Sequence, residues 1–159
     1  MYNNRDKKSG IIKALLIIAG VMGGATIAKA ALSAKRVFRE NDRKAKALQE
    51  KDPQLFMSSN MIIFGKSAMQ VKETTDIIFA TAIFGRMEVD FTSCPIKKET
   101  YVDCTAVKGT VILRVPQDAE VLHDGMTFER KQFEDEENES PVIHVTENFE
   151  GGKLEIIRG

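Results

Sequence analysis

The sequence predicts a mainly β protein whose strands stack as repeated units, preceded by a membrane-spanning helix. Two observations carry the β prediction. A short apolar or mixed run reaches a glycine at Gly65, Gly85, Gly109 and Gly152, and apolar and polar residues alternate after each glycine. Alternation with period two is the pattern of a half-buried strand, because successive side chains point to opposite faces. A third observation, an apolar segment over residues 11–32, predicts the helix.

Aligning the four units on their glycines places matching residues at the same positions. Two, four and six residues after each glycine, the side chains are apolar except at two places, Ser67 and Arg158. The residues between them are mostly charged or polar and suit a solvated face. The aligned apolar positions are Met87, Val111, Leu154, Met69, Val89, Leu113, Ile156, Val71, Phe91 and Val115.

The glycines are separated by 20, 24 and 43 residues, and a further unit with a long insertion would account for the last gap. Repeats of this length are typical of stacked supersecondary units, as in a β-solenoid. A glycine at a fixed place would allow a bulge, a positive φ or a close approach of two backbones. The alternative is an antiparallel sandwich whose strands happen to carry glycines.

Composition bounds the possible partners. A chain of 159 residues supports one modest domain with appendages. Its 23 lysines and arginines balance 23 aspartates and glutamates, so global charge does not predict nucleic-acid binding. Cys94 and Cys104 could pair in an oxidising compartment, or each could be a small buried side chain. Their spacing matches no zinc motif.

The N-terminal part of the chain reads as a membrane anchor. Residues 1–10 form a polar tail, and residues 11–32 are the predicted transmembrane helix, about 33 Å long at helical rise. Lys13 and Lys29 stand where lysine side chains can reach the lipid headgroups. Two alternatives remain open: a secretory signal cleaved after Ala30, which would leave a secreted ligand-binding domain, and a buried helix of a soluble protein.

Residues 33–52 are predicted to form a basic juxtamembrane helix or stalk. Val37, Phe38, Ala45 and Leu48 give it only a thin apolar stripe, so we expect either a solvated spacer or a helix attracted to anionic lipid. Proline at position 53 ends it. Basic residues are more numerous after the predicted span than before it, which slightly favours a single-pass protein with its β-domain in the cytoplasm.

The repetitive β-domain is predicted over residues 60–159, with an acidic surface insertion near 129–140. No constellation for catalysis is present in the sequence. His123 and His144 are isolated, no serine lies in a nucleophile motif, and no glycine-rich loop precedes a helix. We therefore predict a protein that is not an enzyme, with no catalytic, cofactor-binding or metal-binding residues and no cofactor.

Two runs within the repeat resemble a known family. They are TAIFGRMEVDFT at residues 81–92 and VKGTVILRVP at residues 107–116. They are similar to the C-terminal domain of LiaF-like, cell-wall-active-antibiotic-response proteins, also called the toastrack type. The resemblance covers about residues 60–121. It implies a stacked β fold and a role in envelope-stress signalling by contact with a membrane-bound sensor kinase. The single predicted span and the acidic insertion depart from that family.

Together these features predict a membrane-anchored, non-enzymatic β-domain that binds a protein partner, such as a membrane sensor, or itself, in the response to envelope stress. The alternative is a scaffold at the membrane that self-assembles in the manner of bactofilins. Exposed terminal units without polar residues would favour the scaffold, because stacked repeats need polar ends to stay apart.

Overall fold

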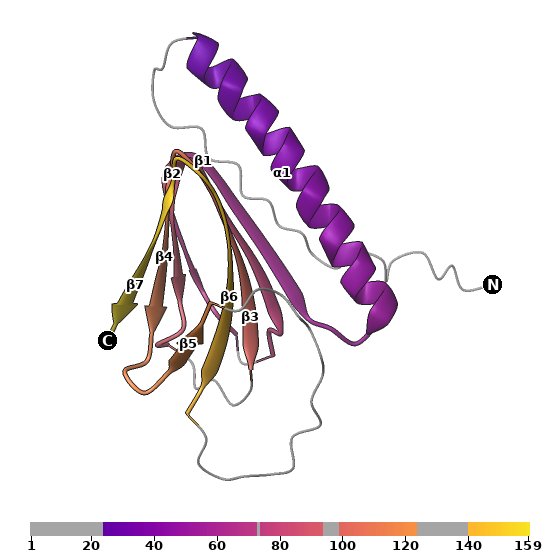
Figure 1. The fold of residues 1–159 in the computed structure, drawn as a ribbon, viewed down its shortest axis with the longest axis vertical. Helices are drawn as coiled ribbons and strands as arrows, with labels where there is room; N and C mark the ends of the chain where they lie inside the picture. Colours follow the sequence, from indigo (N-terminus) through magenta and orange to yellow (C-terminus); the bar gives the residue numbers. More distant parts are fainter. Residues whose placement is uncertain (1–23, 73, 94–98, 124–139) are drawn as a thin grey trace, which may run out of the picture.

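The computed structural model describes residues 24–72, 74–93, 99–123 and 140–159, and within them the protein is mainly β (Figure 1). One helix, α1, precedes the strands. Its bounds and those of the strands are α1 Gly24–Lys51, β1 Met57–Gln70, β2 Ile77–Asp90, β3 Thr100–Val107, β4 Thr110–Val115, β5 Glu120–Leu122, β6 Val142–Glu150 and β7 Lys153–Arg158.

All pairs between these strands are parallel. Strand β2 pairs with β1 along its length, with β3 over its first half and with β4 over its second half. Strands β6 and β7 extend the sheet beyond β3 and β4, and β5 borders β6. The chain therefore runs in successive rows: β1, then β2, then β3 with β4, then β6 with β7. The antiparallel sandwich is wrong, because neighbouring rows run in the same direction.

Each row bends sharply at the glycine identified in the sequence (Figure 1). Gly65 is the register partner of Gly85, and Arg86, Thr110 and Lys153, each one residue beyond a glycine, are aligned across neighbouring rows. The predicted alignment of the four units is confirmed by this register. We call the part of each row before its glycine the first wall and the part after it the second wall.

The main core lies inside the bend, between the two walls. Alternate residues of each row point inward, so Ile78, Val89, Val102 and Leu113 are fully buried in one cluster. In the second wall, buried residues of β2 alternate with half-buried ones, as the sequence predicts for a half-buried sheet, whereas in β4 Ile112 is buried together with Val111 and Leu113. The first wall is different. All eight residues of β3 are buried, because both of its faces are covered.

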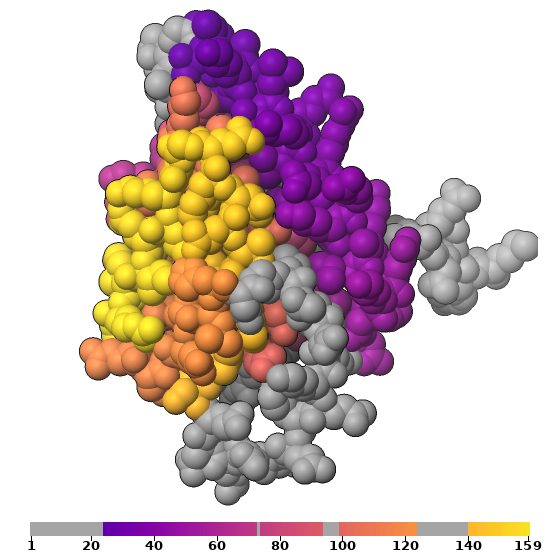
Figure 2. All heavy atoms as spheres, viewed as in Figure 1, coloured from indigo at the N-terminus to yellow at the C-terminus, as the bar shows by residue number. Residues whose placement is uncertain are grey.

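Helix α1 covers the outer face of the first wall (Figures 1 and 2). A stripe with helical spacing faces the sheet: Ala30, Ala34, Val37 and Asn41 are buried, and Ala45 and Leu48 pack further along. The expectation of a solvated stalk is therefore not met. Small alanines let the helix approach closely, and the outer face of the first wall supplies the apolar surface that the stripe needs.

The two terminal rows carry polar residues where the inner rows are apolar. Ser58 and Asn60 in β1 align with Ile78 and Ala80 in β2, and Ser67 aligns with Met87. In the last row Glu147 aligns with buried Cys104, and Arg158 aligns with Val115. Arg158 donates hydrogen bonds to the carbonyl oxygens of Gln117 and Ala119. Both ends of the stack of described rows therefore expose polar groups.

Several predicted segments fall wholly or largely outside the described residues: the tail 1–10, residues 11–23 of the predicted span, Cys94 and the acidic insertion 129–140, of which Ser140 alone is described. Among the described residues, no helix is both long enough and apolar enough to cross a bilayer. Ala30 is 1% exposed because the sheet covers it, so this end of the predicted span belongs to the folded domain. Cys104 is buried in the main core.

Candidate functional site

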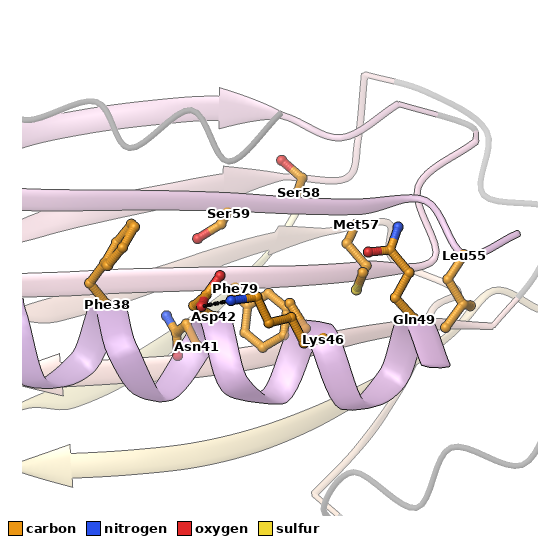
Figure 3. Close-up of a pocket in the computed structure, with 11 residues that line it drawn as sticks. Phe38, Asn41, Asp42, Lys46, Gln49, Leu55, Met57, Ser58, Ser59 and Phe79 are labelled. Atoms are coloured by element: carbon orange, nitrogen blue, oxygen red, sulfur yellow. Dashed lines mark hydrogen bonds and ion pairs between the residues drawn. The ribbon is translucent and has the colours of Figure 1, made fainter. Parts of the chain in front are cut away.

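A groove of about 190 Å³ lies between α1 and the edge strand β1 (Figure 3). The helix forms one side of it, and the first residues of β1 with the preceding turn form the other. The residues that line it are Phe38, Asn41, Asp42, Ala45, Lys46, Gln49, Leu55, Met57, Ser58, Ser59 and Phe79.

The groove exists because α1 rests mainly on β2 and leaves the edge strand partly uncovered. Asn41, buried in the α1 stripe, donates a hydrogen bond of 3.4 Å to the hydroxyl of Thr81 in β2. Within the described part of the chain, β1 pairs with β2 on one side and with no strand on the other. An edge strand beside a helix is the arrangement in which an added peptide segment finds both backbone and side-chain contacts.

The groove combines an apolar floor with a polar rim. Phe79 and Leu55 are buried at its base, while Asp42 and Lys46 form an ion pair of 2.7 Å on the helix side. Phe38 is 44% exposed at the groove, and Phe56, next to the lining residue Met57, is 63% exposed. Aromatic side chains left open beside a hollow are typical of protein-binding sites.

A buried charge pair fixes the helix side of the groove. The Lys44 ammonium lies 2.8 Å from Asp103, whose side chain is fully buried on the outer face of β3. Asn148 donates a second hydrogen bond to Asp103, at 2.9 Å. Burial acts to lower the pKa of Lys44, but the contacts with Asp103 and Glu40 outweigh it and raise that pKa above its ordinary value. Lys44 therefore stays charged at neutral pH.

The sequence suggested that the two histidines are isolated, but in the structure each has a close neighbour. The ring of His144 stacks on that of Tyr101 with centroids 4.5 Å apart, and its Nε2 lies 3.4 Å from Glu99. Nδ1 of His123 lies 2.5 Å from Glu147. The pairing of strands creates both contacts: Tyr101 and His144 are register partners across β3 and β6, and His123 follows β5, which pairs with the strand that carries Glu147. Neither histidine lines the groove.

No site residue was predicted from the sequence, so the groove is a feature that sequence reasoning missed. One residue in the sequence nevertheless pointed to the groove. Phe38 was assigned to the apolar stripe of the helix, yet the buried stripe runs through Val37 and Asn41 and leaves Phe38 outside it. A large aromatic beside a completed stripe is a sequence signal of apolar surface that the domain's own core does not cover. The edge position of β1 could not be read from the sequence.

The described residues hold no cluster of three or more histidine, cysteine or acidic side chains that could bind a metal ion. Comparisons with protein-family models, with curated proteins and with solved structures give no match for this chain.

Proposed function

We propose that this chain is a single-pass membrane protein whose non-enzymatic β-domain binds a segment of another membrane protein, such as a sensor, in the response to cell-envelope stress. The observation that carries the proposal is the groove between α1 and β1, with its apolar floor, polar rim and open strand edge. The anchor would be the predicted span at residues 11–32, limited to its part before Lys29 because Ala30 packs on the sheet. The stress-response role is supported by the resemblance to LiaF-like proteins.

The toastrack-type fold is part of this proposal. Parallel rows that bend at glycines in common register are what a short, stacked β-solenoid requires. The scaffold alternative, in which the ends of the stack polymerise, has less support. The terminal rows present Ser58, Asn60 and Glu147 at inward positions, and polar groups there oppose the addition of another copy.

The test is site-specific photocrosslinking in intact cells that produce the protein. A photoreactive phenylalanine analogue at Phe38 would lie in the groove, and the same analogue at Ile156, which is 36% exposed on β7, is the matched control. We expect an adduct with an integral membrane protein, identified by peptide mass, from position 38 and not from position 156. Adducts from both positions alike would contradict the groove. An adduct containing only this chain would favour self-assembly.

The anchor is tested separately on the same cells. The chain should stay at full length and remain in the membrane fraction after washing with alkaline carbonate. A chain shortened by cleavage after Ala30 would contradict the anchor and would restore the secreted alternative.

A further inference from the structure

The bend of the sheet lies beside the N-terminal turns of α1. A surface hollow is lined on the helix side by Lys29, Leu32 and Ser33. On the sheet side it is lined by residues of the bends, Phe84, Val107, Lys108, Glu150 and Gly151. Figure 1 shows the start of the helix and the bends of the rows at the same end of the molecule. The helix and the sheet are therefore joined at the end from which the chain leads back toward residues 11–23.

This junction limits how far the β-domain can lie from the membrane. If residues 11–28 cross the bilayer, Lys29 marks the membrane surface, and the hollow begins at that residue. One helical turn advances about 5.4 Å, so the bends would lie within about one turn of the headgroups. Ala30 and Ala34 are packed on the sheet, which leaves no free linker between anchor and domain.

The bend end of the molecule carries more base than acid: Lys29, Lys66, Arg86, Lys108 and Lys153 against Glu150 and Glu155. Lys66, Arg86 and Lys153 each follow a bend glycine, and the register places them in one line across the rows, about 4.8 Å apart from row to row. Arg86 and Lys153 contact Glu155. Among the described residues, no ion pair engages Lys29, Lys66 or Lys108.

Apolar side chains accompany this charge. Ile27 is 44% exposed and Leu32 is 69% exposed, and both lie on the part of α1 nearest the bends. Exposed leucine and isoleucine among lysines are suited to the boundary between headgroups and acyl chains. The opposite end of the sheet carries more acid than base: Asp52, Asp76, Asp90, Glu99, Asp118 and Glu120 against Lys51, Lys72, Arg114 and Arg158.

We infer that the bends of the sheet form a second binding surface, which docks on the anionic headgroups of the bilayer that holds the anchor. The inference rests on the anchor of the proposed function and adds an orientation to it. Lys66 and Lys108 contact the lipid surface, Leu32 enters its boundary just beyond the anchor, and the acidic end points away. Each basic residue near an anionic surface adds to the attraction. The groove beside Phe38 and Gln49, further along α1, is then held away from the lipid for a protein partner.

The full-length chain reconstituted in lipid nanodiscs provides the test. In a Cys94→Ser background, a fluorophore is placed by Thr110→Cys at the bend or by Gln117→Cys at the opposite end, and the discs contain a lipid with a nitroxide on its headgroup. These two positions are about 20 Å apart along the strand direction. With phosphatidylglycerol in the discs, we expect quenching at position 110 to be at least about twice that at position 117.

The charge dependence is tested with matched variants. Lys66→Glu combined with Lys108→Glu should reduce quenching at position 110, and so should discs of phosphatidylcholine alone. The control, Lys51→Glu combined with Lys72→Glu, makes the same change in charge at the other end and should leave the quenching unchanged. Raising the salt from about 0.1 M to about 1 M shortens the Debye length from about 10 Å to about 3 Å and should also reduce the quenching at position 110.

The failures are distinguishable. Equal quenching at the two positions, with the chain still inserted in the discs, would overturn the docking and leave the anchor intact. Stronger quenching at position 117 would overturn it in favour of the opposite orientation. A chain that does not insert in the discs would contradict the anchor and therefore the docking with it. Circular dichroism of each variant shows that the fold is retained.

Discussion

At the scale of single residues, the bends depend on two adjacent positions. The residue before the glycine adopts the left-handed conformation, with φ of 59° at Phe64, 51° at Phe84 and 48° at Lys108. The glycine is needed for a different reason. A Cβ on Gly109 would lie 2.6 Å from the carbonyl oxygen of Ala82 in the neighbouring row. The sequence left three roles open for these glycines: a bulge, a positive φ or a close approach of two backbones. At Gly109 the close approach applies.

Gly109→Ala should therefore destabilise the fold strongly. The added methyl group meets backbone oxygens of Ala82 and Gly85, which cannot move without shifting a row, so we expect a loss of about 2–3 kcal/mol. The matched control is Gly151→Ala, where the nearest atom to a new Cβ is 3.7 Å away and the cost is the positive φ alone, about 1 kcal/mol. Urea denaturation in mild detergent measures both. Equal losses would contradict the packing argument.

The thiol of Cys104 should be inert in the folded protein. Burial raises its pKa, and the negative charges of Asp103 and Glu147 raise it further. A Cys94→Ser variant, in which Cys104 is the one cysteine, should react with a thiol reagent at pH 8 only after urea is added. Rapid reaction of the native variant would show that this part of the core opens.

The same shift makes stability depend on pH. The unfolded thiol loses its proton near its ordinary pKa of about 8.5, whereas the folded thiol keeps it. The stability that this group contributes is thus complete below about pH 8.5 and declines as the pH rises above it. Replacing Cys104 with alanine should reduce the decline, and urea midpoints at pH 7.5 and 9.5 measure it.

At the scale of elements, α1 is the part whose role changes most between sequence and structure. Its basic residues predicted a lipid-facing or solvated helix, yet one of them, Lys44, reaches the buried carboxylate of Asp103. The helix thereby helps to cover the outer face of β3, on which Tyr101 and Val107 lie together with the polar Asp103 and Thr105. The groove beside Phe38 depends on this docking, since α1 forms one of its sides.

Lys44→Ala should loosen the helix. It leaves Asp103 buried with the hydrogen bond from Asn148, and removing one member of a buried pair costs about 3–5 kcal/mol. The lysine is 28% exposed, so we expect the lower part of that range. Arg36→Ala is the control, because its pair with Glu150 is more than half exposed and should contribute less than about 1 kcal/mol. Thermal unfolding of both variants measures the two losses, and an equal loss would contradict the special role of the Lys44–Asp103 pair.

The Lys44 contact also has a pH limit. Because the pKa of Lys44 is raised in the folded state, its contribution is complete below the unfolded pKa of about 10.4 and is lost as the pH rises through the higher folded value. The protection factors of the α1 amides, which correct for the faster intrinsic exchange in alkali, should therefore fall in strongly alkaline solution in the native chain.

At the scale of the whole molecule, local patterns in the sequence predicted the rows, their inward positions and the glycine alignment. The two exceptions in that alignment, Ser67 and Arg158, turn out to lie in the first and last rows, where the stack ends. Parallel pairing and the docking of α1 could not be read, because both depend on contacts between distant segments. Predicting the groove would have required both the strand pairing and the docking of α1, since the groove lies where the helix meets the edge strand β1.

The polar ends of the stack should keep copies of the protein apart. Replacing Ser58 with isoleucine, Asn60 with alanine and Ser67 with methionine gives β1 the side chains found at the same positions in β2. Because β1 also offers an open strand edge, we expect this triple variant to self-associate where the native chain does not.

Ala68→Ile combined with Gln70→Met adds apolar groups to exposed positions of the same strand and serves as the control. Sedimentation velocity in mild detergent measures the association. A native chain that already forms long assemblies would contradict the role of the polar ends and would favour the scaffold. Equal association of the triple variant and the control would show that apolar surface at any place on β1 is sufficient, and would contradict a special role for the inward polar positions.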